Sequence, residues 1–408
     1  MSAKGVLSDC FVLVASKRLS AVEAVPAKSN QHEFNGSGAL RKLLGNEDRR
    51  KIQTKFIWLN DYEEGASDEG FVSWYDSRRN QPHRSAEYRL YYQSNAVSEL
   101  MEEGDTLFLA LRPSGELFVI VTPAESEIGN QVHWLFGLQV EPTLEFETRD
   151  IKNDAAEKLD FAARFILDEL GVDYEVPETE QLDELLIKFG GKLPTTKIFA
   201  EFARETVLQK VSPIEDPDAT LMAWLDHEEK LFRRHEHFMI AKRLKAGFIS
   251  REGTDVEGFI KFSLGVQNAR KSRMGLSLEH HTGEILKAHG VKFSRGQITE
   301  HKNKPDFLFP DIAAYHDSEY PIEKLTMLAS KSTCKDRWRQ VLSEAEKIHS
   351  KHLLTLELGI SQNQTDEMRA KNLQLIVPKR IHTSYNATQQ LWLMDMQTFL
   401  TLVSERQR

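Results

Sequence analysis

The sequence contains little cysteine and no long apolar run, and both absences restrict the class of protein. Its 408 residues include only two cysteines, Cys10 and Cys334, which lie far apart in the chain. This usage is typical of reduced thiols in a cytoplasmic protein rather than of a disulfide framework. No apolar run approaches the roughly 20 residues of a membrane span, and charged residues interrupt the apolar N-terminal patch, unlike a signal peptide. We therefore expect a cytoplasmic protein with no membrane association.

Two common catalytic patterns are also missing. The segment GSGALRKLLG (36–45) has glycines and a lysine but lacks the GxxxxGK[ST] spacing of a phosphate loop, so no nucleotide cofactor is expected. The segment HEEKLFRRHEH (227–237) has three histidines without the HExxH spacing of a zinc protease. An exposed helix face is the simpler interpretation of these histidines.

The net charge of −9 disfavours a nucleic-acid partner only at first sight. Residues 141–190 contain 15 Asp and Glu against 5 Lys and Arg, a net of −10, so the remainder of the chain is close to +1. Two stretches in that remainder are basic: 267–304 has 8 basic and 3 acidic residues, and 331–352 has 6 and 3. Since DNA binding needs a local basic surface rather than a basic total, DNA remains a candidate partner.

The chain length predicts two or three domains. Short aromatic or β-branched runs separated by polar turns predict a mainly β domain over residues 1–145, a barrel or sandwich. An acidic segment with helical spacing predicts a helical connector over 146–192. Helices followed by alternating strands and helices predict an α/β domain over 193–408. The runs expected to be strands in the first domain are TKFIWLND, EGFVSWYDS, EYRLYYQS, HWLFGLQV and the hairpin DTLFLALRPSGELFVIVTP.

The strongest chemical signal is a pair of segments in the α/β part. KPDFLFP (304–310) places Asp306 before a strand, and SKSTCKDRWRQVLSEAEKIH (330–349) places Lys331 at the end of another. Phosphodiester hydrolysis needs a cation at the phosphate, an activated water and charge stabilisation in the transition state. A carboxylate and a lysine at neighbouring strand ends can supply part of this. The second acid that such a site usually has two residues before its lysine is absent, because that position is Ala329.

The helix expected after Lys331 can supply the missing acid. Thr333 with Asp336 fits a capping box, and an apolar stripe follows at helical spacing. Glu344 lies on this predicted helix and can return toward the space beside Ala329. Spacing alone also allows a purely structural interpretation, in which Asp306 caps a turn, Lys331 protects a strand edge and Glu344 pairs with a nearby lysine.

Three ordered segments of the C-terminal half resemble the catalytic domain of EcoRII-type restriction endonucleases: 270–279 (RKSRMGLSLE), 304–323 and 327–349. The resemblance implies a restriction-endonuclease-like PD-(D/E)XK core that uses Mg²⁺, with Lys331 as the catalytic lysine. It implies that Asp306, Glu344 and Glu279 hold the metal ion. It also implies that Tyr315 belongs to the active site. Base reading of a CC…GG core and contact with target DNA are implied for Lys335, Asp336, Arg337, Arg339, Arg270, Lys271 and Arg273.

The N-terminal half resembles the same family more loosely, through SKRLSA (16–21), NQHEF (30–34) and the spacing in residues 74–92. In the family this domain is a DNA-binding pseudobarrel that binds a second, effector copy of the target. The resemblance implies effector contacts by Arg18, His32, Arg78, Arg84, Glu87 and Arg89. Solvated arginines on a β surface are the alternative interpretation.

One departure concerns the segment AWLDHEEKLF (223–232), where the family places an Arg and an aromatic that hold bases flipped out of the duplex. Leu225 and Glu229 occupy the aligned positions here, with Trp224 out of phase. The central bases of the target are therefore left open by the sequence.

Together these observations predict a Mg²⁺-dependent type II restriction endonuclease, effector-activated, that cuts double-stranded DNA as a homodimer. A DNA-binding regulator with an inactive nuclease core and a structure-specific repair nuclease are the alternatives.

Overall fold

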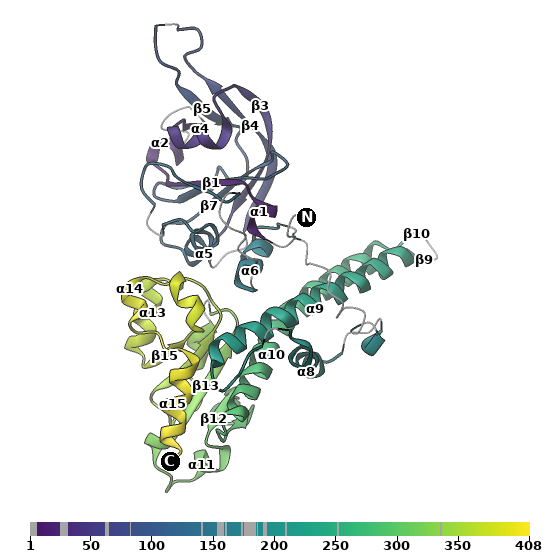
Figure 1. The fold of residues 1–408 in the computed structure, drawn as a ribbon, viewed down its shortest axis with the longest axis vertical. Coiled ribbons are helices and arrows are strands. Elements are labelled where there is room, and N and C mark those ends of the chain that lie inside the picture. Colours follow the sequence, from purple (N-terminus) through teal and green to yellow (C-terminus); the bar gives the residue numbers. More distant parts are fainter. Residues whose placement is uncertain are drawn as a thin grey trace. The chain divides into compact units, whose positions relative to one another are not determined.

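The computed structural model describes residues 6–24, 32–61, 65–81, 83–139, 142–152, 161–172, 194–208, 210–250, 253–334 and 337–408, with positions 159, 174, 185 and 187–190. The chain forms two compact units (Figure 1). The first comprises residues 1–175 with 358–361, and the second comprises 176–357 with 362–408. In the described part of the chain, no helix has the length and apolar character needed to cross a membrane.

The first unit is built on an eight-stranded sheet in the order β2-β5-β4-β3-β7-β6-β1-β8. Neighbouring strands are antiparallel except for the parallel pair β3 and β7. The strands are β1 Leu13–Arg18, β2 Glu33–Asn35, β3 Arg49–Trp58, β4 Ala66–Asp76, β5 Tyr88–Tyr92, β6 Thr106–Leu111, β7 Leu117–Thr122 and β8 Glu147–Asp150. The helices of this unit are α1 Leu7–Cys10, α2 Ala21–Ala24, α4 Gly38–Leu44, α5 Glu127–Phe136 and α6 Phe161–Glu169.

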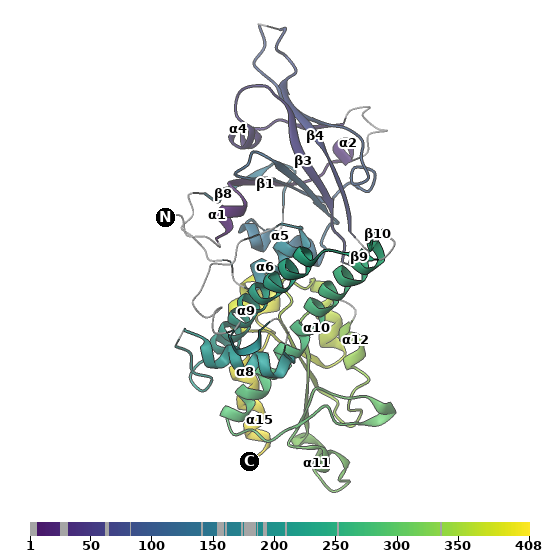
Figure 2. The ribbon, with the colours of Figure 1, turned by 90° about the vertical axis from the view of Figure 1, so that its right-hand side faces the viewer.

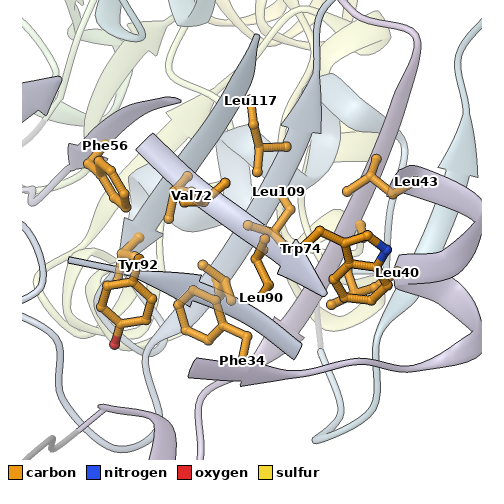
Figure 3. Close-up of a cluster of buried hydrophobic side chains, with 14 of the residues drawn as sticks. Phe34, Leu40, Leu43, Phe56, Val72, Trp74, Leu90, Tyr92, Leu109 and Leu117 are labelled. Atoms are coloured by element: carbon orange, nitrogen blue, oxygen red, sulfur yellow. The ribbon is translucent and has the colours of Figure 1, made fainter. Parts of the chain in front are cut away.

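Side chains that alternate between buried and exposed positions along the strands explain how this sheet packs on its core. In β5 the even-numbered residues Tyr88, Leu90 and Tyr92 are buried, while the odd-numbered ones face outward. The buried set packs with Trp74 of β4, whose ring stacks on Tyr88 at 5.0 Å and whose Nε1 donates to the Gly45 carbonyl at 3.0 Å. Leu40 and Leu43 of α4 close this core (Figure 3). Aromatic and branched side chains of this kind favour a half-buried pleated surface.

Two sequence expectations for this unit need correction. The run HWLFGLQV, expected as a strand, is the end of helix α5 and the residues after it. Ser126 caps this helix by accepting from the Gly129 N–H, and Gly137 ends it in the left-handed region at φ 59, as is common at helix ends. Residues 147–150, expected in a helical connector, form β8 and pair with β1. The domain boundaries at 145 and 192 stay a prediction.

The second unit is an α/β unit with a five-stranded sheet in the order β11-β12-β13-β14-β15. The first three strands are antiparallel, and β13, β14 and β15 are parallel. These strands are β11 Ser294–Arg295, β12 Phe307–Phe309, β13 Thr326–Lys331, β14 Lys351–Thr355 and β15 Leu373–Ile376. The α/β character predicted from the sequence is confirmed.

Helices cover this sheet and extend beyond it. Helices α9 (Pro217–Ala246) and α10 (Val256–Ala288) run side by side and are joined through the short strands β9 (Ile249–Ser250) and β10 (Gly253–Thr254) (Figures 1 and 2). Phe399 of α15 (Met396–Arg406) contacts Phe309 of β12 and His352 of β14. The other helices are α8 Thr196–Thr206, α11 Ile312–His316, α12 Trp338–Val341, α13 Gln362–Ala370 and α14 Ala387–Gln390, with 3-10 turns η1 Glu300–Lys302, η2 Ile322–Lys324 and η4 Lys379–Ser384.

The helix expected from Thr333 to His349 is much shorter than predicted. Helix α12 covers only Trp338–Val341, and its N-cap is Arg337, without a side-chain capping bond. Trp338, Val341, Ala345 and Ile348 are all buried, as the apolar stripe required. The stripe is completed by a turn instead of a helix, because Ala345 adopts φ 48, which is outside the helical region.

Candidate active site

Asp306 and Lys331 lie side by side because β12 and β13 are antiparallel. Asp306 directly precedes β12, and Lys331 is the last residue of β13. The Asp306 Oδ2 atom accepts from the Ser330 N–H at 2.7 Å and from the Lys331 ammonium at 3.1 Å. Their side chains are 14% and 22% exposed, so solvent reaches the pair. A charge-assisted contact of this kind holds both groups at one place on the sheet edge.

Glu344 belongs to the same electrostatic neighbourhood, although it lies in the turn after α12 and not on a helix. Burial raises the pKa of Glu344 to about 7; Lys331 lowers the pKa and Asp306 raises it. Its Oε2 atom is buried and has no hydrogen-bond partner within the described residues. Ala329, the position without an acid, is fully buried in β13. The Glu344 carboxylate thus interacts with Asp306 and Lys331 from a turn rather than from a helix.

Glu279 of α10 approaches from the helical side of the unit. Its Oε2 atom accepts from Arg295 Nη2 at 2.7 Å, and Arg295 Nη1 lies 2.9 Å from Nδ1 of His280. Burial raises the pKa of Glu279, the bond from Arg295 lowers it, Asp306 raises it and Lys331 lowers it. Arg295 was missed by the sequence reasoning, and its place in the basic stretch 267–304 was the available signal.

The Tyr315 hydroxyl contacts Glu300 and the turn that carries Glu344. This buried hydroxyl donates to Glu300 Oε2 at 2.6 Å and accepts from the Lys347 N–H at 3.3 Å. Burial and the bond to Glu300 raise the pKa of the Tyr315 hydroxyl. Tyr315 therefore contacts the segment just after Glu344.

The residues present fit a hard divalent cation with water ligands. Within the described ranges, no three His, Cys, Asp or Glu side chains form a group able to hold a metal ion by themselves. Mg²⁺ is usually held by one or two carboxylates while it keeps several waters. The buried, unpartnered Glu344 Oε2 is the observation that fits such a cation, because a buried carboxylate is costly without a partner.

The residues expected to contact target DNA are dispersed. Arg337 is exposed, and Arg339 pairs with Glu367 at 2.9 Å. Arg270 pairs with Glu236 at 2.7 Å. Lys335, Asp336 and the side chain of Lys271 lie outside the described residues.

Arg273 does not lie where the DNA-contact prediction requires it. It is 8% exposed, donates to the Pro194 carbonyl at 3.1 Å and lies over the rings of Phe199 and Phe232 at 4.6 and 5.0 Å. In this conformation its guanidinium holds helix α8 against α9 and α10, because Phe199 and Phe232 belong to α8 and α9. A buried cation in this position is not accessible to a duplex.

The histidines of α9 and α10 are also more buried than expected. His235 and His281 are fully buried. His281 Nε2 lies 2.8 Å from Glu228 Oε2, and Ser277 donates to Glu228 Oε1 at 2.6 Å. The expectation of an exposed helix face is therefore wrong for His235.

The positions aligned with the base-flipping pocket have structural partners. Leu225 is buried, and Glu229 accepts from Arg233 Nε at 2.6 Å. Trp224 is 8% exposed, and its ring lies 5.6 Å from that of His281.

A polar and aromatic surface of the first unit gathers four of the six predicted effector residues. Glu87 forms ion pairs with Arg78 and Arg89, and Arg84 also acts electrostatically on Glu87. Arg84 donates to Gln81 at 3.2 Å. Register places Tyr75 opposite Arg89 and Ser73 opposite the exposed Tyr91. Tyr75 and Tyr91 were missed by the sequence reasoning, and the alternation of β4 and β5 was the signal.

The remaining two predicted effector residues lie deeper. Arg18 ends β1, and its Nε is buried without a hydrogen-bond partner in the described part of the chain. The His32 ring packs edge-on against Tyr92 at 5.5 Å.

The second unit thus combines an α/β sheet with an Asp–Lys pair at adjacent strand ends. Residues 232–400 match the family model described as EcoRII C terminal. A curated relative, the type II restriction enzyme EcoRII of Escherichia coli, is 44% identical over 182 residues, which are 43% of this chain and 45% of that protein. The resemblance to EcoRII-type restriction endonucleases is confirmed over this part, and the chain spans less than half of the relative's length.

Solved structures of other restriction endonucleases are more distantly similar. Metal-depleted Ecl18kI in complex with uncleaved, modified DNA is 14% identical with a TM-score of 0.41, over 55% of this chain and 82% of that one. The PspGI–substrate DNA complex is 14% identical with a TM-score of 0.40, over 57% and 93%.

Proposed function

We propose that the protein is a type II restriction endonuclease that hydrolyses double-stranded DNA at a short site with a CC…GG core, with Mg²⁺ as cofactor. The observation that carries the proposal is the neighbourhood of Asp306, Lys331 and Glu344, in which a buried oxygen of the Glu344 carboxylate has no hydrogen-bond partner among the described residues. The 44% identity to the E. coli enzyme over 182 residues supports it, as does the family match over residues 232–400, which include all three side chains.

Asp306 and Glu344 would hold the cation, with Glu279 as a further acid beside them. When bound, Mg²⁺ would polarise the scissile phosphate and acidify a coordinated water. Lys331 directs its ammonium at Asp306, 3.1 Å away, so its remaining N–H groups can orient the attacking water and stabilise the phosphorane-like charge. The attacking water would release a proton to solvent as its oxygen bonds to phosphorus, the bond from phosphorus to one bridging oxygen would break, and that oxygen would leave with a proton taken from solvent.

We infer that the sheet of the first unit is a pseudobarrel that binds an effector copy of the target. Support comes from Arg78, Arg84 and Arg89 around Glu87, with Tyr75 and Tyr91 on the neighbouring strand positions. Guanidinium groups contact phosphates and guanine edges, and tyrosines add hydrogen-bonding and stacking surface. The protein would act as a homodimer, because a palindromic target matches two-fold symmetry, and would work in the cytoplasm.

The proposal is tested by incubating unmethylated plasmid and phage DNA with the full-length protein and Mg²⁺. Discrete fragments, lost in Lys331→Ala but kept in the matched surface variant Lys371→Ala, are expected. Binding without fragments would favour a DNA-binding regulator, and cutting without sequence-defined bands would favour a structure-specific nuclease. Mapping the fragment ends gives the central bases of the site.

A further inference from the structure

The turn that carries Glu344 is not stabilised by helical geometry. Helix α12 ends at Val341, and Glu344 follows in a turn whose next residue, Ala345, has φ 48 and is fully buried. A non-glycine residue in this region is uncommon and persists only where its surroundings impose it. The position of the Glu344 carboxylate therefore depends on contacts made from outside the turn.

Lys351 makes the most direct of these contacts. It is the first residue of β14, it is 6% exposed, and its ammonium donates to the main-chain carbonyls of Glu344 and, at 3.0 Å, of Ala345. The charge of Lys351 also acts on the Glu344 carboxylate. A buried ammonium costs free energy unless it is paired or hydrogen-bonded. The two carbonyls therefore stabilise the Lys351 ammonium, and the ammonium in turn stabilises the turn.

A second set of contacts fixes the other end of the turn. Glu300 accepts from the Glu346 N–H at 3.3 Å, and the Tyr315 hydroxyl accepts from the Lys347 N–H at 3.3 Å. The Lys347 ammonium donates to the Tyr315 carbonyl at 2.8 Å. Among these groups, only Lys351 contacts the main chain of Glu344 itself; Glu300 and Tyr315 contact Glu346 and Lys347. Lys351 therefore acts most directly on the position of the Glu344 carboxylate.

We propose that Lys351 is a positioning residue for the nuclease site, which holds the Glu344 carboxylate beside Asp306 by fixing the main chain of Glu344 and Ala345. The inference rests on the proposed function, because it requires Glu344 to be a ligand of the metal ion. Lys351 does not touch the substrate, so its loss acts through the cation site. Residues that orient metal ligands change metal affinity or activity by about 10- to 100-fold when they are replaced.

The test is calorimetric titration of Mn²⁺ into the full-length protein, with plasmid cleavage and melting temperature measured on the same samples. Lys351→Met removes the ammonium and keeps the length of the side chain, and Lys351→Gln keeps one donor without charge. Arg406→Met is the matched control, because Arg406 also donates to a main-chain carbonyl of this unit, that of Leu325 at 3.4 Å, away from the turn. We expect about 10- to 100-fold weaker Mn²⁺ binding for Lys351→Met and a smaller loss for Lys351→Gln.

In cleavage assays, kcat should fall for Lys351→Met while KM for DNA stays constant, and Arg406→Met should keep both. A folded Lys351→Met protein that binds Mn²⁺ within about threefold of the wild type, below the lower limit of this range, overturns the proposal. Failure of both Lys351 variants to fold overturns it as well, because the lysine would then serve the fold. A wild-type protein that neither binds Mn²⁺ nor cuts DNA refutes the proposed function, and the role of Lys351 with it.

Discussion

Replacing Glu344 with glutamine should stabilise the protein at alkaline pH while it abolishes cleavage. The side chain is largely buried, and burial raises its pKa from 4.5 to about 7. Its Oε2 atom has no hydrogen-bond partner in the described part of the chain. An ionised carboxylate in this position therefore costs folding free energy, which a neutral amide of the same size avoids.

The sign and size of the effect follow from linkage between protonation and folding. The folded state binds the Glu344 proton more tightly than the unfolded state, so the free energy of unfolding falls as pH rises from 4.5 through 7. Below that range the carboxyl is protonated in both states and costs nothing. Above it the full cost applies, and a rise of this size corresponds to about 3 kcal/mol. Glu344→Gln should recover most of this at pH 8 and almost none at pH 4.5.

The assay is urea unfolding of the wild type, Glu344→Gln and Glu346→Gln in EDTA at pH 4.5 and pH 8. Glu346 is the matched control, since it lies on the same turn with its side chain 51% exposed. Added Mg²⁺ should stabilise the wild type at pH 8 and leave Glu344→Gln unchanged, because a bound cation favours the ionised carboxylate. A Glu344→Gln variant that is no more stable than the wild type at pH 8 would refute the reasoning.

Three further outcomes are expected. Lys331→Ala should lose plasmid cleavage by several orders of magnitude, on the order of 10³-fold or more, yet retain DNA binding in a gel-shift assay, because it removes charge stabilisation and not the binding surface. Trp338→Ala should lower the free energy of unfolding by about 3–5 kcal/mol in a denaturant titration, because this indole is fully buried beneath the turn; an unchanged midpoint would contradict the packing. Arg89→Ala should weaken binding of the first unit's surface to DNA and reduce the salt slope of log K by about 1, whereas the exposed Glu99→Gln should not.

The sequence was sufficient for the elements that depend on local pattern. The aromatic and β-branched runs of β4, β5 and the β6–β7 hairpin predicted strands that the structure contains, and helices were correctly expected ahead of the strands of the second unit. The run HWLFGLQV was misread, because its β-branched and aromatic residues outweighed Ser126 and Gly137, which start and end α5. Capping residues at the ends of that segment were the better guide.

The candidate site was predicted in its residues but not in its geometry. Asp306 and Lys331 follow from neighbouring strand ends, so their contact was accessible from the sequence. The helix expected around Glu344 was wrong, since the spacing of Trp338, Val341 and Ala345 fits both a helix and a short helix followed by a turn. The turn is contacted from outside by Lys351 of the next strand and by Glu300 and Tyr315. A contact between residues on different elements does not alter the spacing of apolar residues, so the sequence pattern does not reveal it.

Burial of charged side chains was equally hard to predict. Arg273 was predicted to contact DNA and His235 to lie on an exposed helix face, but both are buried, and Arg273 donates to the Pro194 carbonyl before helix α8. Arg295 was overlooked because its role comes from its contact with Glu279, 16 positions away. Whether such a charged side chain is buried depends on a partner from another helix or strand. The sequence contains both residues of the pair but does not show that they meet.

The central claim is that Asp306 and Glu344 share one divalent cation beside Lys331. The most direct measurement is the anomalous difference map of crystals of the full-length Lys331→Ala protein grown with target DNA and Mn²⁺. We predict an anomalous peak in contact with a carboxylate oxygen of Asp306 and with Oε2 of Glu344. A map in which Mn²⁺ contacts Asp306 while the Glu344 carboxylate points away from it would contradict the account.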